Sequence, residues 1–477
     1  MSSASAWTAW SIVLPLLGAL TSWLLGRRNV TVSLLAAFAT LFAVGRLALE
    51  VSTAGVLRHR VGGWGAPLGI ELRADGAAAL LLVVFGGVGA LTSAAAVGFF
   101  PAGRRRTTFF ALWLLGWGGL NALLLSADLF NLYVALELMT LATVGLVSLG
   151  STPNAFAAAL QYLFVALLGS LGYLLAVALV YGQCATLDVE LVGRRLPPGT
   201  LASAAFLLVA ASLSLKSALF PVHAWLPSVY ANAPPPVSAL LSGVFGKAAF
   251  LVFYRAGTHV FPGMIGSPAA QIIGAQGGAA ILWASAIACR QRRLKMLIAY
   301  SSLAQIGYLF LAFPMGTPLA RAGALYMAVS HAAASAAMFT AAGALEQVAG
   351  SDSIDALGGV ARHHPLTFFS LAIGGLTLMG LPPTGGFIAK WMLVRAALGC
   401  GQWWWAFVVL AGGLIAAAYV FRILRGAFAP PTPTPTATTR PPIGSEVISF
   451  LLASISLLLG TAPSWALALL MQTDEGR

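Results

Sequence analysis

The sequence predicts an all-α integral membrane protein with about 14 transmembrane helices. Charged residues make up only 8% of the 477 residues, whereas apolar types make up 59%. Soluble domains carry about 25% charged residues, so the composition excludes an ordinary soluble enzyme, and the apolar content excludes a disordered chain. The apolar residues also gather in runs of about 20, the length that crosses the hydrocarbon core. Two of these runs are interrupted by proline beside a lysine, an interruption typical of transport sites.

The individual spans follow from the positions of the apolar runs. The first run has no basic segment before it, so we expect a retained span and not a cleaved signal peptide. The basic clusters Arg104–Arg106 and Arg290–Lys295 favour a cell-membrane orientation with both termini outside. The expected spans are residues 7–25, 30–50, 76–98, 107–125, 129–149, 156–181, 201–220, 236–254, 270–289, 296–313, 319–343, 366–394, 403–424 and 446–470.

The two interrupted spans suggest internal repeats within a single polytopic domain, residues 1–477. The seventh span reads SLKSALFPVHAWLP and the twelfth reads LMGLPPTGGFIAKW. Proline removes a helix hydrogen bond and glycine permits the resulting backbone path, so both helices should break near the middle of the membrane. The breaks are expected at Pro221, Pro382, Pro383, Gly385 and Gly386. Equal blocks of five spans predict inverted repeats at residues 107–254 and 270–424. A Pro/Thr-rich linker follows at residues 429–442.

Several chemistries find no support in the sequence. Isolated Cys184, Cys289 and Cys400 lie in or beside apolar stretches and are expected to be packing residues, with no disulfide, metal or iron–sulfur motif. There is no nucleotide-binding loop, so we expect no cofactor, no resident metal and no redox chemistry within this chain. The basic residues lie between apolar runs, which argues against nucleic acid as a partner. Four of the six histidines look like loop residues: His59, His259, His363 and His364.

The distribution of lysine is the most informative feature. The chain has 22 arginines but only four lysines, and three of these, Lys216, Lys247 and Lys390, lie within expected spans. Arginine stays protonated, whereas burial favours the neutral form of lysine and a neighbouring carboxylate favours the charged form. The arginines are therefore expected to be anchors and the three lysines to be titratable groups.

Glu137 is the only acidic residue well inside an expected span. A charged group at the bilayer centre costs about 3 kcal/mol, so Glu137 should face the bundle interior and pair with a cation, for which Lys216 is the obvious candidate. The alternative is a purely structural ion pair between the fifth and seventh spans. Because Lys247 and Lys390 have no acidic partner of this kind, a functional role is favoured.

Two histidines are candidates for proton transfer. His331 lies in the middle of the eleventh span, between Lys247 and Lys390 in chain order, and can carry protons near neutral pH. A buried, hydrogen-bonded structural histidine is the alternative. His223 follows the break at Pro221, where it could gate proton entry or equally cap freed carbonyl groups.

Four stretches carry a resemblance to a known family. They are SADLFNLYVALELM around Glu137, KSALFPVHAWLPSVYANAPPPVSALLSGVFGK from Lys216 to Lys247, LKMLIAYSSLAQIGY from Lys295, and GLPPTGGFIAKW before Lys390. They resemble the antiporter-like family shared by the proton-pumping subunits of respiratory complex I and the large subunits of Mrp-type cation/proton antiporters. The resemblance is greatest to the D-type subunits of Mrp antiporters.

The resemblance implies a role for each site residue. Glu137 and Lys216 would form the half-channel pair, Lys247 and His331 the central relay, and Lys390 the exit. Where many members have a relay lysine, this chain has Ser335. Water near Ser335, Ser330 or Tyr326 would then fill that step.

The expected function is proton translocation by one subunit of a multisubunit membrane complex, with other membrane subunits, lipid and protons as partners. We call the row Glu137, Lys216, Lys247, His331 and Lys390 the axis. Sodium fits the axis less well than protons do because hard cations prefer oxygen ligands and lysines repel them. One alternative is a membrane-arm subunit of a quinone oxidoreductase or membrane hydrogenase, which leaves the enzyme assignment open. Another is a structural subunit, or one serving a different ion-coupled uptake system.

Overall fold

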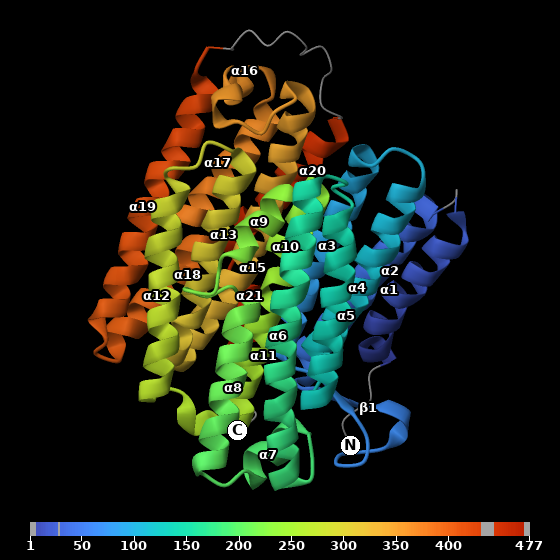
Figure 1. Cartoon of the computed structure of the whole chain (residues 1–477), viewed down its shortest axis with the longest axis vertical. Helices are drawn as coiled ribbons and strands as arrows, with labels where there is room; N and C mark the ends of the chain where they lie inside the picture. The colour runs from blue at the N-terminus through green and yellow to red at the C-terminus, as the bar shows by residue number, and fades with distance from the viewer. Residues whose placement is uncertain (1–5, 27–28, 431–442, 472–477) are drawn as a thin grey trace.

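The computed structural model describes residues 6–26, 29–430 and 443–471 and is a bundle of long helices (Figure 1). Within these residues, 12 helical segments are long and apolar enough to cross a membrane. Two further spans are broken helices, which gives the 14 spans predicted. The unbroken helices are α1 (Ala6–Leu24), α2 (Asn29–Ala54), α3 (Gly76–Phe99), α4 (Arg104–Leu125), α5 (Leu129–Ser148), α6 (Pro153–Cys184), α12 (Pro268–Ala288), α13 (Leu294–Phe310), α15 (Pro318–Ala349), α19 (Trp403–Phe428) and α20 (Ile443–Thr461). The expected linker lies, from residue 431 onward, outside the described residues, as do Arg27 and Arg28.

Three of the long helices start at a capping residue followed by proline. The side chains of Thr152, Ser267 and Thr317 each accept a hydrogen bond from a backbone N–H in the first turn of α6, α12 and α15. In each case proline comes next, where its missing N–H costs nothing because that position has no helical partner. These caps fix where the three helices begin.

The seventh and twelfth spans are broken, as the sequence predicts. The seventh consists of α8 (Thr200–Lys216) and α9 (Trp225–Asn232), and the twelfth of α17 (Pro365–Met379) and α18 (Gly385–Gly399). The eighth span is also interrupted, which the sequence did not reveal because no proline is involved. α10 (Pro235–Gly243) stops at Val244, a 3-10 turn spans Phe245–Lys247, and α11 (Ala248–Arg255) continues the path into a π-helical turn, Ala256–Val260.

The expected last span, residues 446–470, was too long. α20 ends at Thr461, and a separate short helix, α21 (Ser464–Met471), follows Pro463 and packs on α3. Proline cannot continue the hydrogen-bond ladder of α20, which explains the stop.

The bundle has two distinct ends. One end, here called the hairpin end, carries a two-stranded antiparallel sheet, β1 (Leu57–Arg60) and β2 (Glu71–Ala74), and the short helix α7 (Val189–Arg195). Glu190 of α7 accepts hydrogen bonds from Arg58 at 2.6 Å and from Arg73 at 2.7 Å, which fastens the sheet to α7. The opposite end, here called the arginine end, carries Arg104–Arg106, Arg290–Arg293 and α16 (Val360–His363). Figure 1 shows α16 at the top and β1 and α7 at the bottom.

α15 is the central helix and positions the site. It packs against α3, α10, α13, α17, α18 and α20, and its whole apolar window is buried. Its sequence around His331, SHAAASAAM, is rich in alanine, and small residues allow neighbouring helices to approach closely in a membrane. His331 is therefore held in the centre of the bundle.

Candidate functional site

The expected ion pair between Glu137 and Lys216 is present. Lys216 Nζ, on the last residue of α8, donates to Glu137 Oε1 of α5 at 2.8 Å. Ser170 of α6 also donates to this carboxylate oxygen. The side chain of Lys216 is 6% exposed and that of Glu137 is 20% exposed, so the pair is largely removed from solvent. The pair sits where α8 ends, and Gly169 of α6 lets the lysine stem pass, because a Cβ there would lie 2.9 Å from Lys216 Cγ.

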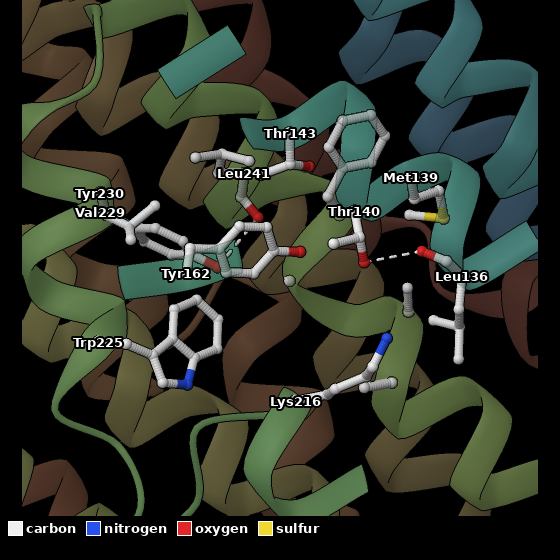
Figure 2. Close-up of a pocket in the computed structure, with 14 residues that line it drawn as sticks. Leu136, Met139, Thr140, Thr143, Tyr162, Lys216, Trp225, Val229, Tyr230 and Leu241 are labelled. Carbon is white, nitrogen blue, oxygen red and sulfur yellow. Dashed lines mark hydrogen bonds between the residues drawn. The ribbon is translucent and has the colours of Figure 1, made fainter. Parts of the chain in front are cut away.

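A small cavity adjoins the ion pair (Figure 2). Its volume is about 40 Å³, room for about three water molecules. Figure 2 shows the amino group of Lys216 directed into this space from α8, opposite Thr140 of α5, with Tyr162 and Trp225 alongside. Thr140 Oγ1 donates to the carbonyl of Leu136 at 2.9 Å, so its lone pairs remain available to the cavity. Polar groups in an enclosed space of this size are suited to holding water beside Lys216.

Lys247 lies at the unexpected break in the eighth span. Its Nζ donates to the carbonyl of Ser242, a group freed by the end of α10, and the residue is 1% exposed. The carbonyls at a helix C-terminus have no intrahelical partners, so a buried ammonium group there satisfies both itself and the helix end. α10 meets α15 just before the break, since a Cβ on Gly243 would lie 3.0 Å from the carbonyl of Ala332, next to His331.

Lys390 is held at the break in the twelfth span in the same manner. Its Nζ donates to the carbonyls of Leu378 at 2.6 Å and Met379 at 3.1 Å, the last residues of α17. The ammonium group also lies 4.5 Å from the centre of the Tyr308 ring, a favourable cation–π distance. Gly380 has a positive φ of 78°, and a Cβ there would lie 2.5 Å from Lys390 Cδ. This glycine both ends α17 and makes room for the lysine.

His331 is 2% exposed, and its Nε2 has no hydrogen-bond partner among the described residues. Two of the hydroxyl groups expected to hold water near His331 form hydrogen bonds to backbone carbonyls instead. Ser335 Oγ donates to the carbonyl of Ala332 in its own helix at 3.4 Å, and Tyr326 donates to the carbonyl of Leu459 in α20. Ser330 Oγ is buried without a partner in the described part of the chain.

His223 lies between α8 and α9 in an aromatic environment. Its ring stacks on Phe220 and meets the edge of Trp283 at a centroid distance of 4.3 Å. Its Nδ1 has no hydrogen-bond partner within the described ranges. The buried, unpartnered nitrogen leaves both the gate and the capping interpretation open.

A polar bridge on α13 joins the surroundings of Lys247 and Lys390, and the sequence reasoning missed it. Ser302 Oγ is 2.7 Å from Ser242 Oγ, on the residue whose carbonyl binds Lys247. Gln305, three residues later on the same helix face, donates to the carbonyl of Leu378, which also binds Lys390. The signal was available in the stretch YSSLAQIGY, where hydroxyl and amide groups recur at helical spacing in an apolar span.

Lys295 is not the loop anchor that the sequence suggested. It lies in the first turn of α13, is 4% exposed, and donates to the carbonyl of Ala233 at 2.8 Å. Glu346 Oε2 lies 3.7 Å from its Nζ. Lys295 is therefore buried like Lys247 and Lys390, and it lies beside a cavity of about 580 Å³ that Arg105 and Glu346 also line at the arginine end.

Among the described residues, no group of three or more histidine, cysteine or acidic side chains is arranged to hold a metal ion. His364, expected in a loop, precedes α17 and its Nδ1 lies 3.0 Å from Glu446 Oε1 of α20. His59 lies in β1, His259 in the π-helical turn and His363 in α16.

Comparisons with known proteins identify the family. A family profile described as "NADH:quinone oxidoreductase/Mrp antiporter, TM" matches residues 126–416, which include every residue of the axis described above. The chain belongs to this family. It is 35% identical to "NADH-quinone oxidoreductase subunit N" of Desulforudis audaxviator over 91% of this chain and 88% of that protein. It is 29% identical to the D-type subunit of the Na(+)/H(+) antiporter of Alkalihalophilus pseudofirmus over 80% of this chain and 78% of that protein.

The fold is likewise that of the NADH:quinone oxidoreductase/Mrp antiporter family. A chain of the Mrp complex from Dietzia superposes with a TM-score of 0.91 at 27% identity, covering 98% of this chain and 97% of that one. The protein is thus a multi-pass membrane protein similar to subunits of multisubunit membrane complexes.

Proposed function

We propose that this chain translocates protons as one subunit of a multisubunit membrane complex. The observation that carries the proposal is the row of titratable groups inside the bundle: the Glu137–Lys216 pair, then Lys247 and His331, then Lys390, with each of the three lysines at a helix break. Ionisable residues inside a membrane are costly and mark ion pathways, and broken helices mark transport sites.

In this mechanism the ion pair controls the proton of Lys216. A proton on Lys216 is favoured while Glu137 Oε1 lies 2.8 Å away, and withdrawal of the carboxylate favours its release into the adjoining cavity. Lys247 is the next basic group along the proposed axis. Lys216 and Lys247 are both lysines, so they differ in proton affinity mainly through their surroundings. Movement of the Glu137 carboxylate toward or away from Lys216 would change which of the two lysines holds the proton more tightly.

The step between Lys247 and Lys390 uses α13 in place of the relay lysine absent at position 335. Ser302 Oγ forms a hydrogen bond with Ser242 Oγ, and the carbonyl of Ser242 accepts the hydrogen bond from Lys247. Gln305 and Lys390 both donate to the carbonyl of Leu378. His331 supplies the titratable group between them. Ser335 donates to its own helix, which leaves the lone pairs of its hydroxyl for a water molecule at this step.

The host complex is proposed to be an Mrp-type monovalent cation/proton antiporter, with this chain in the position of the D-type subunit. The fold similarity to the Mrp complex over 98% of the chain supports this version. The 35% identity to an N-type subunit of NADH-quinone oxidoreductase favours a second candidate, a proton-pumping subunit of an NADH:quinone oxidoreductase or related redox complex. In either host, protons follow the axis, and any sodium site lies elsewhere.

The proposed arrangement in the cell membrane places the hairpin end outside. The arginine clusters at the opposite end favour a cytoplasmic position for that end, and both described chain ends lie at the hairpin end (Figure 1). The expected inverted repeats, residues 107–254 and 270–424, each contain one span that is interrupted at proline beside a lysine, which supports their proposed equivalence.

The test is proton flux through the purified native complex in liposomes that contain a pH-sensitive dye. Lys216→Ala should abolish voltage-driven flux, whereas Arg46→Ala, which removes an exposed cation from α2, should leave flux at the wild-type level. Flux that survives Lys216→Ala would refute the proposal and favour a structural subunit. The subunits that purify with the chain decide between the two hosts.

A further inference from the structure

A row of hydroxyl groups joins α20 to the part of α17 that precedes the turn holding Lys390. α17 and α20 both start at the arginine end, and their side chains pair with a constant offset of 79 residues. Thr367 donates to Glu446 Oε1 at 3.0 Å, Ser370 and Ser449 lie 3.0 Å apart, and Thr377 and Ser456 lie 2.7 Å apart. We call this row the α17–α20 seam: Thr367, Ser370, Thr377, Glu446, Ser449 and Ser456.

The seam is buried along its length and partly exposed at one end. Its five hydroxyl residues are each at most 2% exposed. At the arginine end, Glu446 Oε1 also contacts His364 Nδ1 at 3.0 Å, and the side chains of His364 and Glu446 are 16% and 14% exposed. A carboxylate and an imidazole therefore form the partly exposed end of the seam.

The inner end of the seam lies one residue along the chain from the carbonyl that holds Lys390. Thr377 directly precedes Leu378, whose carbonyl accepts the hydrogen bond from Lys390 Nζ. α18 touches the same turn, because a Cβ on Gly386 would lie 2.1 Å from the carbonyl oxygen of Thr377, and Lys390 follows Gly386 by one turn. From Thr367 to Thr377 the helix rises about 15 Å, half of the hydrocarbon thickness. The seam therefore connects the arginine end with the depth of Lys390.

The bonding pattern suits proton transfer. In the pairs Ser370–Ser449 and Thr377–Ser456 either oxygen can be the donor. Ser370, Thr377 and Ser449 each also donate to a carbonyl of their own helix, so reversal of a pair bond requires a hydroxyl to leave that carbonyl. Such reversal is what a proton passed along hydroxyl groups requires. One pair is missing, at Gly374 and Ala453, where Met338 of α15 packs against the glycine. Met338 fills that turn, so proton transfer across it would require the flexible methionine to move and admit a water molecule.

We propose that the α17–α20 seam is a proton conduit between the arginine end and Lys390. The proposal rests on the proposed function and adds a route to it. The competing explanation is that the hydroxyl pairs only hold the two helices together, since such bonds are common between membrane helices. If the seam conducts protons, removal of a hydroxyl group lowers proton flux. If the seam only holds the helices together, removal of a hydroxyl group lowers the melting temperature and leaves flux unchanged.

The experiment compares hydroxyl deletion with hydroxyl retention in the full chain within its purified complex, reconstituted in liposomes. Thr377→Val and Ser456→Ala should each lower proton flux about tenfold, the rate equivalent of one lost hydrogen bond. Thr377→Ser and Ser456→Thr retain the hydroxyl and should keep wild-type flux. Ser454→Ala is the matched control, because this serine of α20 donates to the carbonyl of Phe450 outside the seam.

The outcomes separate the seam from the axis. Flux that Lys216→Ala abolishes but Thr377→Val and Ser456→Ala leave unchanged overturns the conduit and keeps the proposed function. A lower melting temperature of the deletion variants with unchanged flux assigns the seam to helix association. Loss of flux in the deletion variants, with melting temperature and subunit content preserved, supports the conduit.

Discussion

Replacing Glu137 by glutamine tests how strongly the ion pair controls Lys216. The substitution keeps the size of the side chain and an acceptor oxygen for Lys216 and Ser170, and it removes only the charge. At the observed 2.8 Å and an effective dielectric of about 20, the attraction between the two charges is about 6 kcal/mol. Moving one charge through 100 mV corresponds to about 2.3 kcal/mol, so making or breaking the pair is comparable with a membrane-potential step.

Part of that attraction is offset by the loss of hydration of both groups. If a third of it, about 2 kcal/mol, contributes to the barrier to proton transfer, Glu137→Gln lowers the rate about 30-fold. The assay is voltage-driven proton flux through the reconstituted complex. Glu190→Gln is the matched control, since it makes the same chemical change at the hairpin end. Equal flux in both variants and the wild type would refute the reasoning.

Three further predictions concern the surroundings of Lys390 and the hairpin end. Gly380→Ala should lower both flux and the free energy of unfolding, the latter by about 1–2 kcal/mol, because alanine is strained at positive φ and its Cβ would displace Lys390; proton flux and thermal unfolding check this. Gln305→Leu should lower flux about tenfold by removing the donor to the Leu378 carbonyl, and wild-type flux would exclude the α13 bridge. Burial raises the pKa of Glu190, but its hydrogen bond and charge interaction with Arg58, together with the charge of Arg73, bring the pKa below its ordinary value. The stability from these contacts is therefore present above the ordinary glutamate pKa of about 4.3 and is lost as pH falls through the lowered value. Glu190→Gln should accordingly cost about 1 kcal/mol at pH 7 and progressively less as the pH falls through the lowered pKa of Glu190, as measured by thermal unfolding.

The sequence was sufficient for the features that follow from polarity and from proline. The spans follow from the apolar runs, and the breaks after Lys216 and before Lys390 follow from Pro221, Pro382 and Pro383. The partnership of Glu137 with Lys216 could be predicted because no other acid lies well inside a span. Each of these follows from residue types that have few alternatives inside a membrane.

Other features depend on packing that a single sequence does not express. The break at Val244 contains no proline, and only the approach of α10 to α15 and the bond from Lys247 to Ser242 reveal it. Lys295 follows a run of arginines, and its burial depends on α13 meeting the start of α10. Serine and threonine are common in membrane helices, so the hydroxyl pairs between α17 and α20 became visible only when the two helices were placed together.

The most direct test of the account is proton uptake by the native complex carrying Lys247→Met. Lys247 lies between the two broken spans in chain order, and methionine preserves its length without a charge. The account predicts that voltage-driven proton uptake is lost while the complex keeps its subunits and melting temperature. Wild-type uptake by this variant would contradict a proton path through the buried lysines.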